Sequence, residues 1–274
     1  IFVHGDTTTT FISALAAFYH KIRIGHIESG LRTNKIYSPF PEEANRQLIS
    51  RITDLHFSPT DLSKKNLIKE NILKKNIFVV GNTAIDTLFH TLKNIKKNFK
   101  EIDFIKRMPF IKSCSGKKII LVTGHRRENF GNGFKNICEA LVNISKISED
   151  IVVIYSVHLN PKVNTYVTNT LKGVKNVFTI NPLNYLDFVK LMDLSYIILT
   201  DSGGIQEEAP SLGKPVLVLR EFTERPEAVK AGTVKVVGTD KTKIYRIAKK
   251  LLTNKKYYES MSKKHNPYGD GNSS

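Results

Sequence analysis

Short apolar runs rich in β-branched residues alternate with longer stretches of helical periodicity along almost the whole chain. Strands separated in this way by helices form parallel sheets that carry helices on both faces. The runs predict strands at 1–4, 22–27, 56–57, 77–80, 117–123, 151–156, 177–180, 197–200 and 215–219. The periodic stretches predict helices at 10–20, 41–52, 60–70, 83–98, 134–147, 161–171, 185–192, 206–212, 226–231 and 242–253. The sequence therefore predicts an α/β protein.

Composition excludes several classes of protein. The 274 residues suffice for one large or two ordinary domains, and 41% of them are hydrophobic, which allows a sizeable core. No apolar run is long enough to predict a transmembrane helix, so we expect no membrane partner. The two cysteines, Cys114 and Cys138, make neither a disulfide framework nor a zinc motif. We expect no metal site and a reducing, cytoplasmic location.

A net charge of +17 raises the question of a nucleic-acid partner. The lysines, however, are scattered through Asn- and Ile-rich helical stretches such as 94–100, which is typical of solvated surface positions. No basic stripe interleaved with aromatic residues and no helix-turn-helix pattern is present in the sequence. We therefore expect no nucleic-acid partner, although the charge would help to attract a small polyanionic ligand.

Polar clusters follow four of the predicted strands. They occupy residues 4–10, 26–33, 124–129 and 201–204. Ligands of parallel sheets bind at the carboxyl ends of the strands, where these clusters are expected to lie. Chance would supply one or two such clusters, so four together indicate a functional site.

The last cluster has the most specific pattern. An apolar run ends at Asp201-Ser202, two glycines follow, and a helix-like stretch then opens. Glycine lets the backbone approach a ligand closely, and a helix N-terminus offers unpaired N–H groups to a phosphate. This segment therefore predicts a phosphate-binding turn.

Each polar residue also has an ordinary structural explanation. Asp6 before a run of threonines fits a helix cap, and Glu28 before Ser-Gly fits a solvated turn. His125 fits a loop histidine whose charged neighbours form surface ion pairs. Acids that open helices, as Glu42 and Glu208 do, favour the helix dipole whatever else they do.

Taken in order, the motifs give the chain a resemblance to the non-hydrolysing UDP-N-acetylglucosamine 2-epimerase family. The matching segments are 4–10, 25–33, 38–46, 57–60, 81–86, 124–129, 200–214, 224–228, 232–233 and 266–271. The resemblance implies a glycosyltransferase-B-like fold: two Rossmann-like, doubly wound domains with a central cleft. The expected ranges are 1–81 for the N-terminal domain and 82–274 for the UDP-binding domain.

The family begins with a strand and a Gly-Thr-Arg-Pro-Glu loop, and neither is found before Ile1. We therefore expect the first domain to lack roughly 80–100 residues. This figure assumes about 30 residues for each strand-helix-strand unit. The closing C-terminal helices of the family are expected to be missing as well.

The resemblance also implies an activity. Family members interconvert UDP-GlcNAc and UDP-ManNAc without a cofactor, by eliminating UDP across C1–C2 to 2-acetamidoglucal and adding it back. Asp6, Glu28 and Glu42 are the implied carboxylates of the sugar site, and one of them is the expected C2 base. His125 is expected to act on the leaving diphosphate as a hydrogen-bond donor or cation.

The implied binding residues belong to the UDP half of the ligand. Backbone N–H groups of Ser202, Gly203 and Gly204 would hold the phosphates, and Glu208 would accept from the ribose hydroxyls. The remaining implied substrate contacts are Arg225 at the diphosphate or uracil, Phe188 near the uracil, and Arg126 beside His125. The family commonly forms homodimers, so a homodimer is expected of the full-length protein.

Three alternatives to the non-hydrolysing epimerase stay open at the level of sequence. A UDP-sugar glycosyltransferase of the same architecture would need an acceptor site and would not need the three carboxylates. A hydrolysing epimerase would release free UDP. A UDP-binding remnant would bind nucleotide and turn nothing over.

Overall fold

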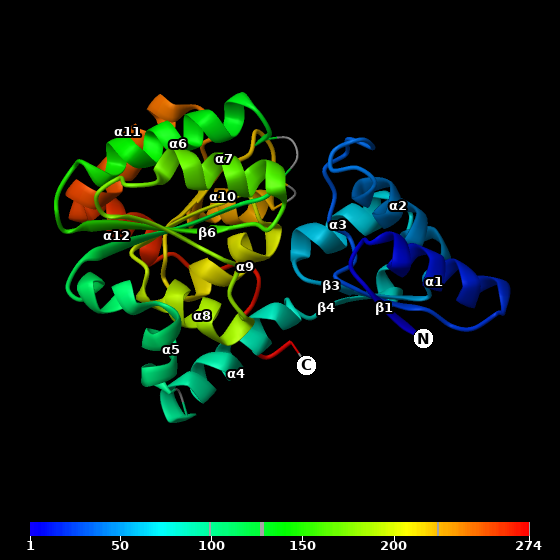
Figure 1. Ribbon diagram of the computed structural model, residues 1–274. Helices are drawn as coiled ribbons and strands as arrows, with labels where there is room; N and C mark the ends of the chain where they lie inside the picture. The colour runs from blue at the N-terminus through cyan, green and yellow to red at the C-terminus, as the bar shows by residue number, and fades with distance from the viewer. Residues whose placement is uncertain (99, 127–128, 224, 274) are drawn as a thin grey trace. The chain divides into compact units, whose positions relative to one another are not determined.

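The computed structural model describes residues 1–98, 100–126, 129–223 and 225–273. It contains two compact units, one formed by Ile1–Thr87 with Pro267–Ser274 and the other by Leu88–Asn266 (Figure 1). Each unit has a parallel sheet whose strands are joined through helices, which confirms the predicted α/β class.

Unit 1 contains a four-stranded parallel sheet of order β1-β2-β3-β4. Its strands are β1 (Phe2–His4), β2 (Gly25–Ile27), β3 (Leu55–Ser58) and β4 (Ile77–Val79). Its helices are α1 (Thr8–Tyr19), α2 (Glu42–Ile52), α3 (Asp61–Lys69) and the short 3-10 turn η1 (Lys74–Asn76). A small core of Val3, Ala14, Ala17, Ile24 and Ile49 joins α1 and α2 to the sheet.

Unit 2 contains a six-stranded parallel sheet of order β10-β9-β8-β5-β6-β7. Its strands are β5 (Lys118–Gly124), β6 (Ile151–Val157), β7 (Val177–Ile180), β8 (Ile197–Thr200), β9 (Val216–Val218) and β10 (Val234–Val236). Counted along the chain, this is the strand order of the doubly wound dinucleotide-binding fold. The order reverses between β5 and β8, which pair with Thr123 opposite Thr200. A ligand site is expected at the carboxyl ends of these two strands.

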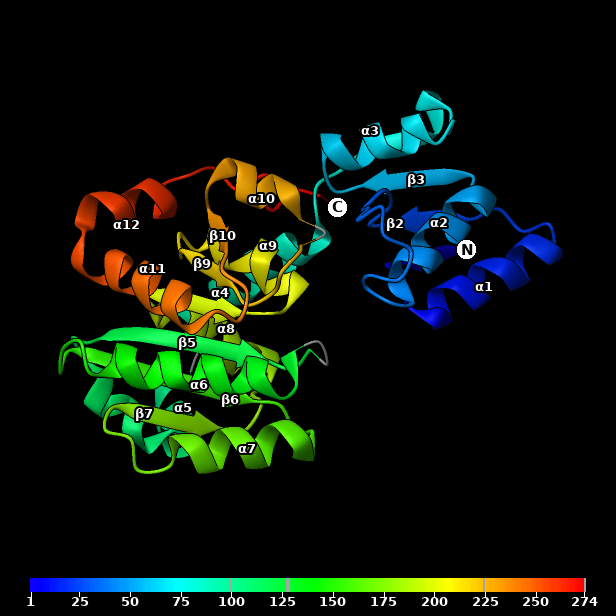
Figure 2. The same cartoon turned by 90° about the horizontal axis from the view of Figure 1, so that it is seen from above.

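Helices cover both faces of the sheet in unit 2. Helices α6 (Asn132–Ser145), α7 (Pro161–Leu171) and α11 (Lys241–Thr253) lie on one face, and α8 (Tyr185–Leu194) and α9 (Gly203–Ser211) lie on the other (Figure 1). In Figure 2, β5, β6 and β7 lie side by side, α6 is drawn in front of the strands, and α7 lies next to β7. The other elements are α4 (Thr83–Asn98), α5 (Glu101–Arg107), η2 (Pro109–Cys114), α10 (Pro226–Ala231) and α12 (Lys255–Ser262).

Every predicted strand and helix is present, and the structure adds five elements. These are η1, α5, η2, β10 and α12. Strand β10 has only three residues and a lysine at its centre, so it carries no β-branched run to predict it. Helix α9 begins at Gly203 rather than at 206, because tertiary packing overrides the poor helix propensity of two glycines.

The compact units differ from the predicted ranges 1–81 and 82–274 in two places. The division lies after Thr87, inside α4, and the last residues of the chain belong to unit 1. The buried Tyr268 explains the second difference, since its carbonyl accepts from the Asn82 N–H at 2.9 Å. The Ser273 N–H also donates to the Asp86 carboxylate at 3.0 Å, which holds the C-terminal segment on the start of α4.

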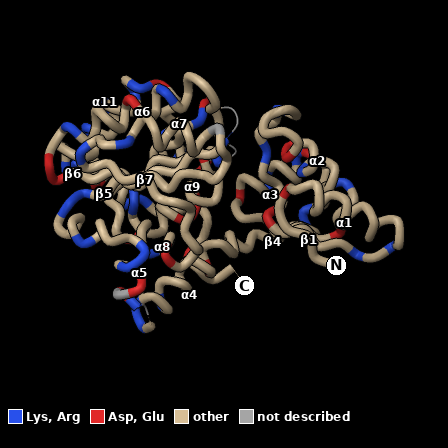
Figure 3. The backbone as a smooth tube through the Cα atoms, in the orientation of Figure 1, with Lys and Arg blue, Asp and Glu red and all other residues tan. Residues whose placement is uncertain are grey.

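The structure also bears on membrane-spanning helices, on the two cysteines and on the distribution of basic residues. None of the described helices is both long and apolar enough to cross a bilayer. Both cysteines are buried and free. Lysine and arginine are distributed over both units (Figure 3).

Candidate functional site

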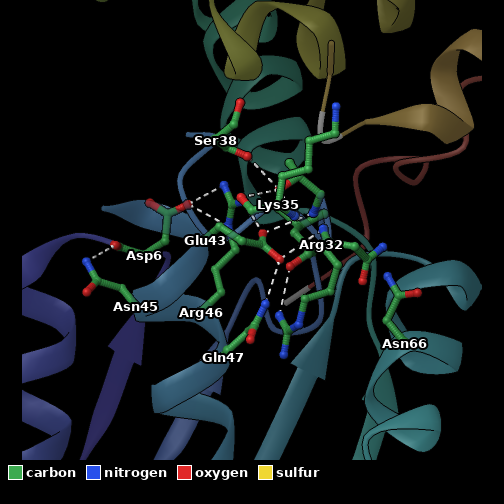
Figure 4. Close-up of polar contacts among 12 residues, drawn as sticks. Asp6, Arg32, Lys35, Ser38, Glu43, Asn45, Arg46, Gln47 and Asn66 are labelled. Carbon is green, nitrogen blue, oxygen red and sulfur yellow. Dashed lines mark hydrogen bonds and ion pairs between the residues drawn. The ribbon is translucent and has the colours of Figure 1, made fainter. Parts of the chain in front are cut away.

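Asp6 lies just beyond the end of β1 and is held there by α2 (Figure 4). Arg46 places Nε at 2.9 Å and Nη2 at 2.6 Å from Asp6 Oδ2. The side-chain amide of Asn45 donates to the Asp6 carbonyl at 2.8 Å. Asp6 is not the cap of α1, because that role belongs to Thr7, whose hydroxyl accepts from the Thr10 N–H. The Asp6 carboxylate is therefore presented at the carboxyl edge of the sheet.

A fully buried carboxylate anchors Arg46 from behind. Glu43 has 0% of its surface exposed and accepts from Arg46 Nη1 at 3.1 Å. It also accepts the backbone N–H groups of Thr33 and Asn34 and the side-chain amide of Gln47. Four donors satisfy this buried charge, so Glu43, Arg46 and Asp6 form one ordered chain of charges.

Glu28 follows β2 with a positive φ of 66°, a conformation that is strained for a residue with a side chain. The neighbouring Gly5 also has a positive φ, and its N–H donates to the Ile27 carbonyl at 3.0 Å. A Cβ at Gly5 would lie 3.3 Å from Glu28 Oε2. The strand ends thus bring the Glu28 carboxylate beside the Gly5-Asp6 turn, as the adjacent polar clusters predict.

Glu42 is the first residue of α2, one turn before Arg46. Its Oε2 is buried and has no hydrogen-bond partner among the described residues. An acceptor held in this way loses its hydration without compensation. Because Asn45 and Arg46 dock the same helical turn on Asp6, Glu42 belongs to the same edge of this sheet as Asp6 and Glu28.

Two histidines lie under this edge, side by side on β2 and β3. His26 pairs with His56 in the sheet register, and both are buried. Burial lowers the pKa of each from 6.5 to about 4, and Arg32 adds to this effect. His26 Nε2 is 2.8 Å from the Gly5 carbonyl, so a neutral His26 donates to it and supports the Gly5-Asp6 turn.

In unit 2, His125 and Asp201 face each other at the ends of β5 and β8. Asp201 is fully buried, and its Oδ2 accepts the backbone N–H groups of His125 and Arg126, each at 2.9 Å. The Asn129 amide donates to the same oxygen at 3.1 Å. His125 Nδ1 lies 3.2 Å from Asp201 Oδ1. The fold thus places this pair at the reversal of strand order.

The surroundings of His125 oppose its protonation. Burial lowers its pKa below the usual value; the Asp201 charge acts in the opposite sense, and Arg126 and His158 lower it further. The His158 ring stacks on that of His125 with centroids 5.5 Å apart. His125 remains partly accessible, with 39% of its side chain exposed. An anionic ligand beside the ring would favour the protonated form.

The predicted phosphate-binding turn is formed by the start of α9. Ser202 caps the helix without a side-chain hydrogen bond to it, and Gly203 and Gly204 form the first turn. The first N–H groups of a helix have no partner within the helix. A Cβ at Gly204 would meet no atom within 4 Å, so there is open space beside this turn. The geometry suits a phosphate group.

Glu208 lies one turn further along α9. Burial raises its pKa to about 7, and the Tyr185 hydroxyl, which donates to Glu208 Oε1 at 3.3 Å, lowers it somewhat. Phe188 lies on the same helix as Tyr185 and is half-buried. The structure therefore brings the predicted ribose contact and the helix of the predicted uracil contact together.

Arg225, the expected diphosphate or uracil contact, is held by the residues around it. Its guanidinium is buried and ion-paired with the buried Glu207. The Thr223 hydroxyl accepts from the Arg225 N–H and donates to the Gln206 side chain. In this structure Arg225 therefore ties the following loop to α9. Arg127, Glu128 and Glu224, which belong to the predicted motifs, lie outside the described residues.

Several residues of the site could not be singled out from the sequence. Glu43 and Arg46 follow Glu42 in a sequence that looks like an ordinary helix start. Their i,i+3 spacing is nevertheless a signal for an ion pair along the helix. Asp201 was part of the phosphate motif, but its contact with His125 depends on the pairing of distant strands. Among the described residues, no group of His, Cys, Asp and Glu could hold a metal ion.

The model of the UDP-N-acetylglucosamine 2-epimerase family matches residues 1–274. The chain is 54% identical to the Escherichia coli K12 UDP-N-acetylglucosamine 2-epimerase over 272 residues, which are 99% of this chain and 72% of that protein.

Solved structures agree with this match. The Neisseria meningitidis UDP-GlcNAc 2-epimerase bound to UDP-GlcNAc is 51% identical, with a TM-score of 0.94 over 99% of this chain and 73% of that one. The Methanocaldococcus jannaschii UDP-GlcNAc 2-epimerase in complex with UDP-GlcNAc and UDP is 37% identical, with a TM-score of 0.82 over 99% of this chain and 72% of that chain. These structures support the predicted two-domain, glycosyltransferase-B-like fold. The chain belongs to the UDP-N-acetylglucosamine 2-epimerase family, a family of isomerases.

Proposed function

We propose that the protein interconverts UDP-GlcNAc and UDP-ManNAc by inverting C2 of the sugar. The observation that carries this proposal is the likeness to the Neisseria meningitidis structure, which holds UDP-GlcNAc and matches 99% of this chain. The carboxylates of unit 1 and the phosphate-binding turn of unit 2 supply the groups that such a reaction needs.

The C2 proton of the sugar has no neighbouring carbonyl to acidify it, so elimination is the proposed route. A carboxylate among Asp6, Glu28 and Glu42 takes the C2 proton as the C1–O bond breaks and its electron pair leaves with UDP. The product of this step is 2-acetamidoglucal. UDP then adds back at C1 while a second acid delivers a proton to the other face of C2.

Unit 2 holds the leaving group in this proposal. The N–H groups at the start of α9 bind phosphate oxygens, and His125 donates from Nε2 to the diphosphate when it is protonated. Glu208, in its ionised form, accepts from the ribose hydroxyls. The negative charge that develops on UDP is thereby stabilised.

The test is incubation of the full-length protein with UDP-GlcNAc in deuterated water. UDP-ManNAc with deuterium at C2, in a mixture without free sugar, is the expected product. Free UDP together with free ManNAc would instead identify a hydrolysing enzyme, and turnover only with an added sugar acceptor would identify a glycosyltransferase. Binding of UDP without any product would identify a nucleotide-binding protein.

We also propose that the full-length protein is a homodimer and that it acts in the cytoplasm, as the family resemblance implies. Light scattering of the purified full-length protein tests its mass in solution. A monomer at micromolar concentration would contradict this part of the proposal.

A further inference from the structure

We propose that Asp201 is the positioning residue of His125, holding the imidazole with a proton on Nδ1 and leaving Nε2 to the phosphate end of the ligand. The role of Nε2 rests on the proposed function, in which His125 contacts the diphosphate. The position of the proton does not, because it follows from the contacts of Asp201 alone.

The two oxygens of Asp201 have different surroundings. Three N–H groups converge on Oδ2, from the backbone of His125 and Arg126 and from the Asn129 amide. Oδ1 is buried and has no hydrogen-bond donor among the described residues. A buried carboxylate oxygen without a donor has lost its hydration with nothing to replace it. His125 Nδ1, 3.2 Å away, supplies the missing donor if it carries the proton and the ring turns slightly toward Oδ1.

A neutral imidazole has one N–H, so a proton on Nδ1 leaves a lone pair on Nε2. A second proton then enters at Nε2 and creates a donor for a phosphate oxygen. The Asp201 charge stabilises that imidazolium, whereas the charges of Arg126, His158 and Arg220 oppose it. Asp201 therefore sets the direction of the donor and favours its charged form.

The strand ends are built closely enough to hold this pair in place. The Thr123 and Thr200 hydroxyls are 2.7 Å apart and link β5 to β8, two residues before His125 and one residue before Asp201. A Cβ at Gly124 would lie 2.8 Å from the Tyr155 hydroxyl and 3.6 Å from Asp201 Oδ2. A side chain there would therefore collide with the Tyr155 hydroxyl, so the end of β5 is closely packed, and a group positioned by rigid strands is held accurately.

The decisive variant is Asp201→Asn. Three donors converge on the Oδ2 position, so the single amide oxygen is expected to occupy it. The amide NH₂ then points at His125 Nδ1, which must become an acceptor, and the ring proton moves to Nε2. We expect a fall in kcat of about 10²–10⁴-fold, the range of a wrong imidazole tautomer, with KM for UDP-GlcNAc changed by less than about threefold.

Nitrogen NMR of the imidazole reads the tautomer directly, with His125→Gln used to assign the signal. We expect the Nδ1–H form in the wild-type protein without ligand and the Nε2–H form in Asp201→Asn. The matched control is Asp187→Asn, which removes another buried carboxylate from unit 2, one paired with Arg107. This control should lower the melting temperature and leave His125 in the Nδ1–H form.

The wild-type spectrum decides the question even if Asp201→Asn does not fold. An Nε2–H form in the wild-type protein, or an unchanged Nδ1–H form in Asp201→Asn, would overturn the proposal. If the tautomers behave as expected but UDP-GlcNAc is not epimerised, the proposed function fails and the role of Asp201 stands.

Discussion

Arg46 holds the Asp6 carboxylate through two nitrogens that converge on one oxygen, with Nε at 2.9 Å and Nη2 at 2.6 Å from Oδ2. No donor among the described residues reaches the other oxygen, Oδ1. That oxygen therefore remains available to accept a proton or a hydrogen bond, while Arg46 fixes the orientation of the carboxylate.

Replacing Arg46 should separate positioning from charge. Lysine keeps the charge but cannot place two N–H groups on one oxygen and a third nitrogen on Glu43. We expect Arg46→Lys to lower kcat about 100-fold with a small change in KM, because a misplaced base lowers the rate of the chemical step. Arg46→Met should also cost about 3–5 kcal/mol of stability by leaving Glu43 buried without its cation.

The matched control is Arg51→Lys in the same helix, where Nη1 donates only to the Glu70 carbonyl. Its kcat and melting temperature should stay close to those of the wild type. Equal loss of activity in Arg51→Lys and Arg46→Lys would show that the helix, and not the contact with Asp6, is what matters.

Replacing a glutamate by glutamine should have opposite effects on stability at the neighbouring positions Glu42 and Glu43. Glu42 Oε2 has no donor among the described residues, so Glu42→Gln removes an uncompensated charge and should leave the free energy of unfolding unchanged or higher. If Glu42 takes part in proton transfer, the same variant should lower kcat by 100-fold or more, taking about 10²–10⁴ as the usual range for an acid or base.

Glu43→Gln, in contrast, is expected to lower the free energy of unfolding. It weakens four hydrogen bonds to a buried carboxylate and leaves Arg46 without its second partner, a loss of about 3–5 kcal/mol. Urea unfolding followed by circular dichroism measures both variants. A larger loss of stability in Glu42→Gln than in Glu43→Gln would contradict this account.

The sequence predicts the fold well because the alternation of apolar runs and helical periods is a local signal. Strands β5 and β6 show it most clearly, since nearly every residue in them is buried. A general rule of parallel sheets predicts sites at the strand ends, and His125, Glu28 and Asp6 are found there. The elements that were missed, such as β10, are short pieces whose form depends on a neighbouring strand.

Contacts between distant residues could not be predicted in the same way. The pairing of Asp201 with His125 depends on β5 lying beside β8, which are separated in the chain by two other strands. The burial of Arg225 against Glu207 likewise depends on how a loop returns to α9. The side chains that act on a ligand have sequence signals, whereas the residues that position them become visible only in three dimensions.

His26 and His56 should make unit 1 sensitive to acid. Both have a folded-state pKa of about 4 against 6.5 for the ordinary side chain. Between these values the unfolded chain binds more protons, so the free energy of unfolding should fall as pH falls from 6.5 toward 4. The loss should approach about 3 kcal/mol per histidine near pH 4.

Urea unfolding at a series of pH values measures this slope. His26→Gln keeps an N–H for the Gly5 carbonyl and removes one titrating group, so its slope should be about half as steep over the same range. The same slope in His26→Gln and wild type would mean that other groups cause the acid sensitivity.

Glu208 should make UDP binding depend on pH near neutrality. Burial raises the pKa of this carboxyl to about 7, and ribose hydroxyls donate to its ionised form. Because the ligand selects the ionised carboxylate, affinity for UDP should rise with pH, about tenfold between pH 6 and pH 8. Calorimetry at each pH measures the affinity for UDP. Glu208→Gln is the reference, because its binding curve contains the titration of UDP and of every other protein group but not that of Glu208.

Tyr185→Phe tests the cause of this pH dependence. The Tyr185 hydroxyl donates to Glu208 Oε1 and lowers the pKa of Glu208, so removing that hydroxyl should raise the pKa further. The midpoint of the wild-type curve, measured against Glu208→Gln, should then move to higher pH in Tyr185→Phe, while affinity well above the midpoint changes little. A midpoint that moves to lower pH, or a Glu208→Gln variant with the same pH dependence as the wild type, would remove Glu208 from the ribose site. The direction of the shift is therefore a sharper test than the loss of affinity, because a damaged pocket weakens binding at every pH and does not move a midpoint.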